Sequence, residues 1–180
     1  MRLFIAIDIP DSEKTKIATE LVELKRDYRD FRWVAAANYH ITLHFLGEVP
    51  EGELKSLISH IENTIFDARS FYLYALHGGI FIRNKITLYL EFQKNRELTA
   101  LVEAVRTIQT PNQNNHKIFI PHLTLARYKI PSKQQYLLIK KKFNKFAPDT
   151  SFEVSKIYLF SSTLNEKTPE YTKVAEFDLH

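Results

Sequence analysis

Two histidines of this chain stand in the same four-residue frame, His-x-Thr-Leu. The frame reads HITL at residues 40–43 and HLTL at residues 122–125, and the two copies lie 82 residues apart. Random placement of the same residues gives about 0.06 such frames per chain, so a second copy needs a cause. The residue types suggest one, because imidazole and hydroxyl groups can move protons and hold anions.

The two frames are suited to phosphoryl transfer by acid–base catalysis. An imidazole has a pKa of about 6.5, so a neutral histidine can take a proton from the attacking water or hydroxyl while a protonated one gives a proton to the leaving oxygen. Thr42 and Thr124 would donate hydrogen bonds to the non-bridging phosphate oxygens and hold the phosphorus in line between the imidazoles. His40 and His122 are therefore the candidate acid and base, and the residues alone leave open which is which.

The element that carries each frame decides whether its side chains can meet. On a strand, residues i and i+2 share a face, so the His and Thr of a frame lie on one face and its two apolar residues on the other. One such frame on an antiparallel strand is ordinary, and alone we would interpret it as surface or core. Two frames whose polar faces meet would place two His and two Thr in one cleft, and we favour that interpretation for the pair.

A metal site is a weaker interpretation of the histidines. His40 and His44 stand four apart, but a zinc-protease site needs that spacing on a helix with Glu directly after the first His, whereas Ile41 follows here in a β-branched stretch. His44 is then expected to be a neighbour of His40 on the strand face. The chain has no cysteine, no Gly-rich phosphate loop and no nucleophile elbow around Ser161-Ser162. We expect neither a metal nor a cofactor.

The composition is that of a folded chain with an uneven charge. The 180 residues are 44% hydrophobic and 13% aromatic, which is enough for a sizeable core. The net charge is +4, with −1 on residues 1–90 and +5 on residues 91–180, a balance that permits a polyanionic partner without requiring one. No apolar run approaches the roughly 20 residues of a membrane span, so we expect a soluble cytoplasmic protein with no membrane contact.

Periodicity and turn residues predict an alternation of strands and helices. Strands are expected at 2–9, at both frames, and at 71–76, 85–92, 152–160 and 171–179; helices are expected from Asp11 or Ser12 to Tyr28 and at 50–65, 96–108 and 133–146. A polar loop is expected at 110–115. This order excludes a helical bundle and a β-sandwich and leaves an α+β fold. The separation of the frames, close to half the chain, suggests two similar lobes that contribute one frame each.

Longer stretches around the frames resemble a known family. They are RLFIAIDIP at 2–10, WVAAANYHITLHFLGEV at 33–49, PHLTLARYK at 121–129, KIYLFSSTL at 156–164 and YTKVAEF at 171–177. Together they are similar to the bacterial and archaeal RNA 2′,3′-cyclic phosphodiesterases, also called 2′-5′ RNA ligases, of the 2H phosphoesterase superfamily. The resemblance implies one domain over residues 1–180, with two pseudo-twofold-related lobes of antiparallel sheet, helices outside and a central cleft.

The resemblance also implies an activity and a partner. The expected reaction is metal-independent hydrolysis of RNA 2′,3′-cyclic phosphate ends to 2′-phosphomonoesters, with reversible 2′-5′ joining of RNA ends as a related activity. His40 would be the proton donor and His122 the proton acceptor, with Thr42 and Thr124 holding the phosphate. The implied partner is RNA with a cyclic phosphate end, such as a tRNA fragment. A monomer without an obligatory protein partner is expected.

Two further residues match the family pattern, and each keeps a plainer interpretation. Arg127 follows the second frame and would neutralise phosphate charge, but strand parity places it opposite His122, so a twist, a bulge or a reaching side chain is needed. Its alternative is a solvated arginine. Phe4 matches the N-terminal Arg-x-Phe pattern and is expected either to stack on a nucleobase or to pack in the core. The chain departs from the family pattern at one place. The family often has a Gly shortly before the Tyr of the last strand, whereas this chain has Thr168-Pro169-Glu170-Tyr171, so the local loop is expected to differ.

Other functions stay open beside this one. Members of the superfamily act on small cyclic nucleotides or oligoadenylates, and the frames do not separate those substrates from RNA. From a different class, the cleft would suit a module that binds AMP-like nucleotides, although intact His and Thr in both frames favour catalysis. The basic run at 140–142 is better explained as a solvated helix face than as an RNA track.

Overall fold

One sheet of nine strands forms the centre of the molecule. The computed structural model describes residues 1–108, 118–164 and 169–180. The strands of this part of the chain are β1 (Arg2–Asp8), β2 (Arg32–Trp33), β3 (His40–Glu48), β4 (Phe71–Ile82), β5 (Ile86–Phe92), β6 (His122–Tyr128), β7 (Ser151–Val154), β8 (Lys156–Leu164) and β9 (Pro169–Asp178). Their order is β7-β4-β5-β6-β3-β1-β8-β9, with β2 paired to β6, and the pairs are antiparallel. The predicted α+β class is confirmed.

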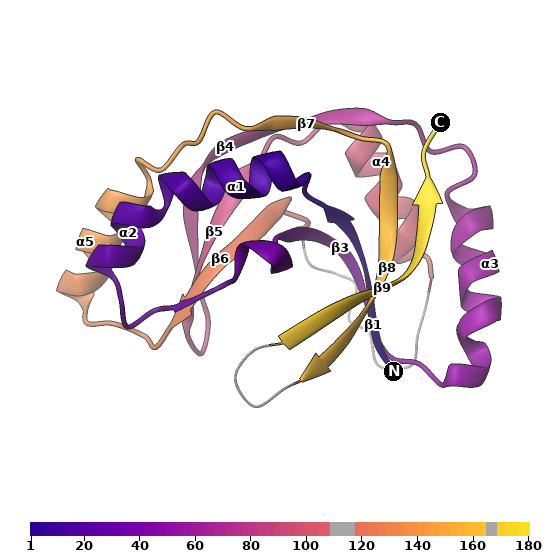
Figure 1. Cartoon of the computed structure of the whole chain (residues 1–180), viewed down its shortest axis with the longest axis horizontal. Helices are drawn as coiled ribbons and strands as arrows, with labels where there is room; N and C mark the ends of the chain where they lie inside the picture. The colour runs from indigo at the N-terminus through magenta and orange to yellow at the C-terminus, as the bar shows by residue number, and fades with distance from the viewer. Residues whose placement is uncertain (109–117, 165–168) are drawn as a thin grey trace.

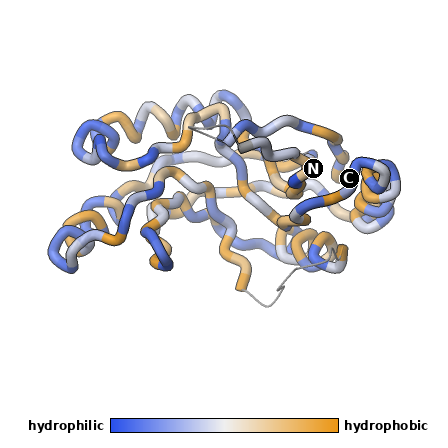
Figure 2. Tube along the Cα trace, turned by 90° about the horizontal axis from the view of Figure 1, so that it is seen from below, coloured by the Kyte–Doolittle hydropathy of each residue, from blue (hydrophilic) through white to orange (hydrophobic). Residues whose placement is uncertain are grey.

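The helices lie outside the sheet (Figure 1). They are α1 (Asp11–Glu20), α2 (Val22–Asp27), α3 (Leu54–Thr64), α4 (Arg96–Arg106) and α5 (Lys133–Phe143), with short 3₁₀ turns η1 (Ala36–Asn38) and η2 (Glu51–Glu53). Asn95 caps α4 by accepting a hydrogen bond from the Leu98 N–H. Ser132 and Gln135 form a reciprocal capping box at the start of α5. Hydrophilic and hydrophobic residues alternate along the helices, as expected for helices with one face on a core (Figure 2).

Two predicted elements are divided in the structure. The helix expected up to Tyr28 is broken at Leu21, whose ψ of −7° forms a turn between α1 and α2. The strand expected at 152–160 is two strands, interrupted at Ser155. The loop expected at 110–115 lies outside the described residues.

One predicted strand is longer than expected. The strand predicted at 71–76 continues to Ile82, because Gly78 and Gly79 pair with β5 instead of turning the chain. Local sequence favours a turn at two consecutive glycines. Packing overrides that preference here: a Cβ on Gly78 would lie 2.5 Å from the Phe143 carbonyl oxygen, so glycine is needed for close approach of α5 to the strand.

The two frames meet in the middle of the sheet, where β3 and β6 are neighbours. A single register pair, Ile41 opposite Leu123, joins these strands. Beyond it, β3 continues beside β1, while β6 continues between β5 and β2. Figure 1 shows the two strands diverging, β3 toward the lower right and β6 toward the lower left. The frames therefore lie on strands that lead into different parts of the sheet. We call β1, β3, β8 and β9 the first lobe and β2, β4, β5, β6 and β7 the second lobe.

The sheet curves so that its two ends approach each other. β7 pairs with β4 and β8 pairs with β1, although Ser155 alone separates β7 from β8 in the chain. Consecutive Cα atoms lie only about 3.8 Å apart, so these distant positions in the strand order must be close in space. The C-terminus is tied down nearby by backbone hydrogen bonds, because the His180 N–H donates to the Ala68 carbonyl and the His180 carbonyl accepts from the Ser70 N–H.

Buried side chains form one large cluster that extends through both lobes and includes Ile41 and Leu123, both without exposed surface. The polar faces of the frames lie on the opposite side of the strands from this cluster. No helix of the described part is long and apolar enough to cross a membrane.

Candidate active site

A β-bulge in the second frame sets the direction of the residues that follow it. Thr124 and Ala126 lie opposite adjacent residues of β5, so Leu125 has no opposite residue. Both Leu125 and Ala126 are buried as a result. The alternation of faces is reversed after the bulge, and Arg127 returns to the face of the frame's His and Thr. Of the three alternatives for Arg127, which were a twist, a bulge or a reaching side chain, the structure contains the bulge.

The first frame contains the same bulge at the same position. Thr42 and His44 lie opposite adjacent residues of β1, which leaves Leu43 without an opposite residue. His44 therefore turns toward the core, where it is 5% exposed and its Nε2 lies 3.0 Å from the Ile108 carbonyl oxygen. The expectation that His44 lies beside His40 on the strand face is wrong, because strand parity does not survive the bulge.

The four polar side chains of the frames share one face at the junction of the lobes. Because Ile41 lies opposite Leu123 in an antiparallel pair, the His of each frame lies opposite the Thr of the other frame. All four residues are partly exposed, unlike the apolar residues between them. The residues brought together in this way are His40, Thr42, His122 and Thr124.

The same backbone contact orients both imidazoles. His40 Nδ1 lies 2.8 Å from the carbonyl oxygen of Asn38, and His122 Nδ1 lies 2.7 Å from that of Ile120. A carbonyl oxygen can only accept, so each Nδ1 carries a proton and donates it to this bond. The Nε2 atom of each ring is left to take a proton or, once protonated, to give one.

Burial lowers the pKa of both His40 and His122 below the usual histidine value. The carbonyl oxygen beside each Nδ1 acts against this effect, as does one carboxylate on the neighbouring strand. These carboxylates are Asp8 and Glu91, which lie directly opposite the two histidines in register. The Arg127 guanidinium lowers the pKa of both histidines, so its charge reaches both sides of the junction.

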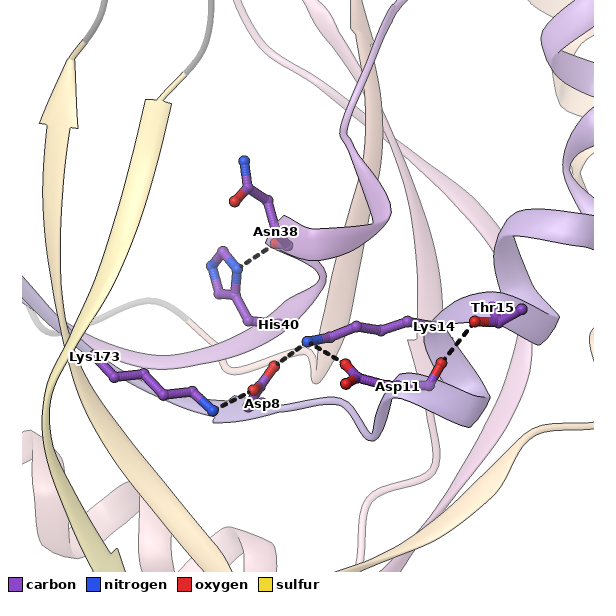
Figure 3. A network of polar contacts seen from close by, with 7 residues as sticks. All are labelled: Asp8, Asp11, Lys14, Thr15, Asn38, His40 and Lys173. Atoms are coloured by element: carbon purple, nitrogen blue, oxygen red, sulfur yellow. Dashed lines mark hydrogen bonds and ion pairs between the residues drawn. The ribbon is translucent and has the colours of Figure 1, made fainter.

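Two lysines hold Asp8 beside His40 (Figure 3). The Asp8 carboxylate lies 2.8 Å from Lys14 Nζ and 2.7 Å from Lys173 Nζ, and the side chain is 18% exposed. Burial alone would raise the pKa of Asp8, but the hydrogen bonds and charges of the two lysines outweigh it and hold the pKa below its usual range. Sequence reasoning missed this group, whose one local signal is a charge at the end of an apolar strand.

Aromatic rings surround His40 in the first lobe. Phe4 is 3% exposed, and its ring centroid lies 5.1 Å from that of His40 and 5.3 Å from that of Phe160. Tyr171 meets His40 edge-on at 5.1 Å. Phe4 thus packs against protein rings, and its stacking on a nucleobase stays a prediction. Phe45, 6.0 Å from Phe4 and 62% exposed, is the ring of this group that solvent reaches most.

The second lobe surrounds His122 in the same manner. The rings of Phe81 and Tyr89 meet His122 edge-on at 5.0 and 5.5 Å and stack on each other at 4.0 Å. These neighbours come from β4 and β5, far from the frame in sequence. Only the pairing of the strands, which a single sequence does not determine, brings them to the histidine.

A cavity of about 460 Å³ between α3 and α4 is a separate feature. None of the residues that line it belongs to a frame or to the strands that carry the frames. Within the described ranges, no three His, Asp or Glu side chains are grouped as metal ligands. We therefore place the candidate site at the frames.

Known proteins are similar to this chain in sequence and in fold. The model of the LigT-like phosphoesterase family matches residues 9–85 and 90–171. The RNA 2′,3′-cyclic phosphodiesterase of Thermotoga maritima is 30% identical, over 98% of this chain and 94% of that protein. Among solved structures, a Thermus thermophilus protein gives a TM-score of 0.80 at 24% identity, covering 99% of this chain and 98% of its own. E. coli LigT in complex with 3′-AMP gives 0.73 at 26% identity, covering 99% and 97%. The chain belongs to the LigT-like phosphoesterase family.

Proposed function

We propose that this protein hydrolyses RNA 2′,3′-cyclic phosphate ends to 2′-phosphomonoesters. The observation that carries the proposal is the meeting of two imidazoles, each with Nδ1 bonded to a carbonyl, and two threonines on one face at the junction of the lobes. The substrate class is supported by relatives named RNA 2′,3′-cyclic phosphodiesterase, at 30% and 28% identity over 98% of the chain.

The proposed reaction is an in-line displacement at phosphorus. His122 Nε2 takes a proton from water as the water oxygen bonds to phosphorus, and His40 Nε2 gives a proton to the ribose 3′ oxygen as its bond to phosphorus breaks. One proton is taken and one is given, so the product is a 2′-phosphomonoester beside a free 3′ hydroxyl. Each proton transfer typically accelerates such a reaction by about 10²–10⁴-fold. If a 5′ hydroxyl takes the place of water, the same two proton transfers would form a 2′-5′ phosphodiester and free the 3′ hydroxyl. The two histidines exchange roles when that bond is cleaved back to the cyclic phosphate.

The remaining polar groups would stabilise the charge that develops on the phosphate. Thr42 and Thr124 would donate hydrogen bonds to the non-bridging oxygens. Arg127, which the bulge turns to this face, would supply a full positive charge. We further propose that the protein acts as a monomer in the cytoplasm, as one domain over residues 1–180, without metal or cofactor, on RNA ends such as those of tRNA fragments.

An end-group assay tests the proposal. A short RNA ending in a 2′,3′-cyclic phosphate is incubated with the protein in EDTA, and the product is identified by ³¹P NMR against 2′- and 3′-phosphate standards. The expected product is the 2′-phosphate, at a rate that the chelator does not change. A 3′-phosphate product, no turnover, or turnover that EDTA abolishes would contradict the proposal.

A second candidate is action on, or binding of, a small nucleotide. It is favoured by the structure of E. coli LigT, which was solved in complex with 3′-AMP and is 26% identical to this chain. The same assay with a mononucleoside 2′,3′-cyclic phosphate distinguishes the candidates. Equal kcat/KM for the mononucleotide and the RNA would favour the small substrate, and binding of 3′-AMP without turnover of either would favour a nucleotide-binding module.

A further inference from the structure

An arginine beside Arg127 lies on the same face of the sheet. Arg32 of β2 lies directly opposite Arg127 in register, and Trp33 lies opposite Ala126. Directly opposite residues of antiparallel strands point to the same face. Ala126 is fully buried and Trp33 packs against the core cluster, so the two arginines share the other face, which is that of the second frame.

Strand β2 is short, but its neighbours hold it in place. Trp33 Nε1 donates a hydrogen bond of 3.0 Å to the Tyr28 carbonyl, and the buried Phe31 ring stacks on Tyr128 at 4.3 Å. β2 occupies the side of β6 that β3 leaves after the single register pair of the frames. The Arg32 backbone is therefore fixed in the space between the lobes, one strand spacing of about 4.8 Å from Arg127.

Neither guanidinium group forms an ion pair with a carboxylate in the described part of the chain. Arg32 is exposed and makes no ion pair or hydrogen bond with any residue that the structure describes. Like charges directly opposite each other on neighbouring strands destabilise a sheet. An arrangement of this kind, on the face that carries the second frame, is favourable when an anion binds to both groups.

We propose that Arg32 binds the internucleotide phosphate that precedes the terminal cyclic phosphate. This inference rests on the proposed function, in which Arg127 and the frames hold the cyclic phosphate itself. A guanidinium presents a planar set of donors that matches two phosphate oxygens. A polynucleotide end would engage both arginines, whereas a mononucleotide has no second phosphate for Arg32. Arg32 thereby selects RNA ends over cyclic mononucleotides.

The test compares two substrates and three proteins. The substrates are uridine 2′,3′-cyclic phosphate and a uridine trinucleotide that ends in the same group. The proteins are the wild type, Arg32→Ala, and Arg69→Ala as a control at an exposed arginine between α3 and β4. The quantity measured is the preference, which is kcat/KM for the trinucleotide divided by kcat/KM for the mononucleotide.

Arg32→Ala is expected to lower this preference about tenfold, the loss of one charged hydrogen-bonding contact, while Arg69→Ala leaves it unchanged. A trinucleotide with a neutral methylphosphonate at its last internucleotide linkage, next to the terminal nucleoside, should show the same loss with wild type and no further loss with Arg32→Ala. The salt dependence of kcat/KM for the trinucleotide should also become shallower, by about 0.7 in the log–log slope. An unchanged preference in Arg32→Ala would overturn the inference.

Failure of the proposed function gives a different result from failure of this inference. If wild type hydrolyses neither substrate, the proposed function is wrong, and binding of a fluorescent uridine trinucleotide with a 2′-phosphate end still tests Arg32. Arg32→Ala should then weaken that binding about tenfold relative to Arg69→Ala. Equal affinity in the two variants would show that no internucleotide phosphate contacts Arg32.

Discussion

At the scale of single residues, the proposed reaction depends on the protonation of two imidazoles. Burial lowers the pKa of both His40 and His122. As the pH rises, each ring of the free protein therefore loses its proton before the pH reaches the ordinary histidine value of about 6.5. The reaction needs one protonated and one neutral ring. The donor disappears as the pH rises above both pKa values, and the acceptor disappears as the pH falls below both.

The expected pH profile of kcat/KM is therefore a bell with its maximum on the acid side of about pH 6.5. The measurement is kcat/KM for the cyclic-phosphate RNA from about pH 4.5 to 8.5, in buffers of constant ionic strength. A maximum above about pH 7.5 would show that the lowered pKa values of the free protein do not govern catalysis.

At the scale of elements, the Asp8 carboxylate joins β1, α1 and β9 through its two lysines. Asp8→Asn removes the nearer of the two carboxylates that pair with the buried Lys14 and leaves only the exposed Asp11. We expect the free energy of unfolding to fall by about 2–3 kcal/mol at pH 7. The pKa of Asp8 is lowered in the folded state, so this stabilisation is present above its unfolded value of about 3.8 and is lost as the pH falls through its folded value.

Urea unfolding at two pH values checks this prediction. The difference between wild type and Asp8→Asn should be full at neutral pH and should shrink once the pH is below about 3.8. Asp178→Asn, at an exposed carboxylate paired with Lys156, is the control and should change stability little. Equal effects of the two substitutions would mean that the Asp8 group has no special structural role.

Gly78 tests the packing of α5 on β4. A Cβ there would lie 2.5 Å from the Phe143 carbonyl oxygen, and a backbone atom can yield only if the helix moves. Gly78→Ala should therefore cost about 1–3 kcal/mol of unfolding free energy. Gly52→Ala, where a Cβ meets nothing within 4 Å, should stay within about 0.5 kcal/mol of wild type. Similar losses in both variants would contradict the close approach of helix and strand.

The bulges mark the limit of what could be predicted about elements and site. Periodicity and turn residues predicted helices where α4 and α5 lie, and strand parity placed the His and Thr of each frame on one face. Parity then failed after Leu43 and Leu125, since an extra residue in a strand is fixed by its partner strand and has no local signature. For the same reason Arg127 was expected on the wrong face without a bulge, and His44 on the exposed one.

At the scale of the whole molecule, the repeated frame predicted two lobes but not how the chain passes between them. The break at Ser155, where consecutive strands take different partners, follows from long-range pairing and not from local propensity. Tyr171 meets His40 and Lys173 pairs with Asp8, although each pair is more than 100 residues apart in the chain. Local sequence patterns do not indicate which of these distant residues come into contact.

The meeting of the frames within one chain makes a prediction about mixtures. If each molecule builds its own site, equal amounts of the His40→Ala and His122→Ala proteins should together show no more activity than either alone. Recovery of a substantial fraction of wild-type activity on mixing, measured with the same RNA, would mean that chains exchange lobes or share a site, contrary to the proposed monomer.

The central claim is that one imidazole from each lobe moves a proton in the reaction, and the rates of the single His40→Ala and His122→Ala proteins test it most directly. The measurement is single-turnover hydrolysis of the cyclic-phosphate RNA in EDTA, with the unfolding free energy of each variant determined in parallel. Each substitution should lower the rate by at least about 10²-fold while the protein remains folded. A loss of less than about tenfold in either folded variant would contradict the claim and place the chemistry on other residues.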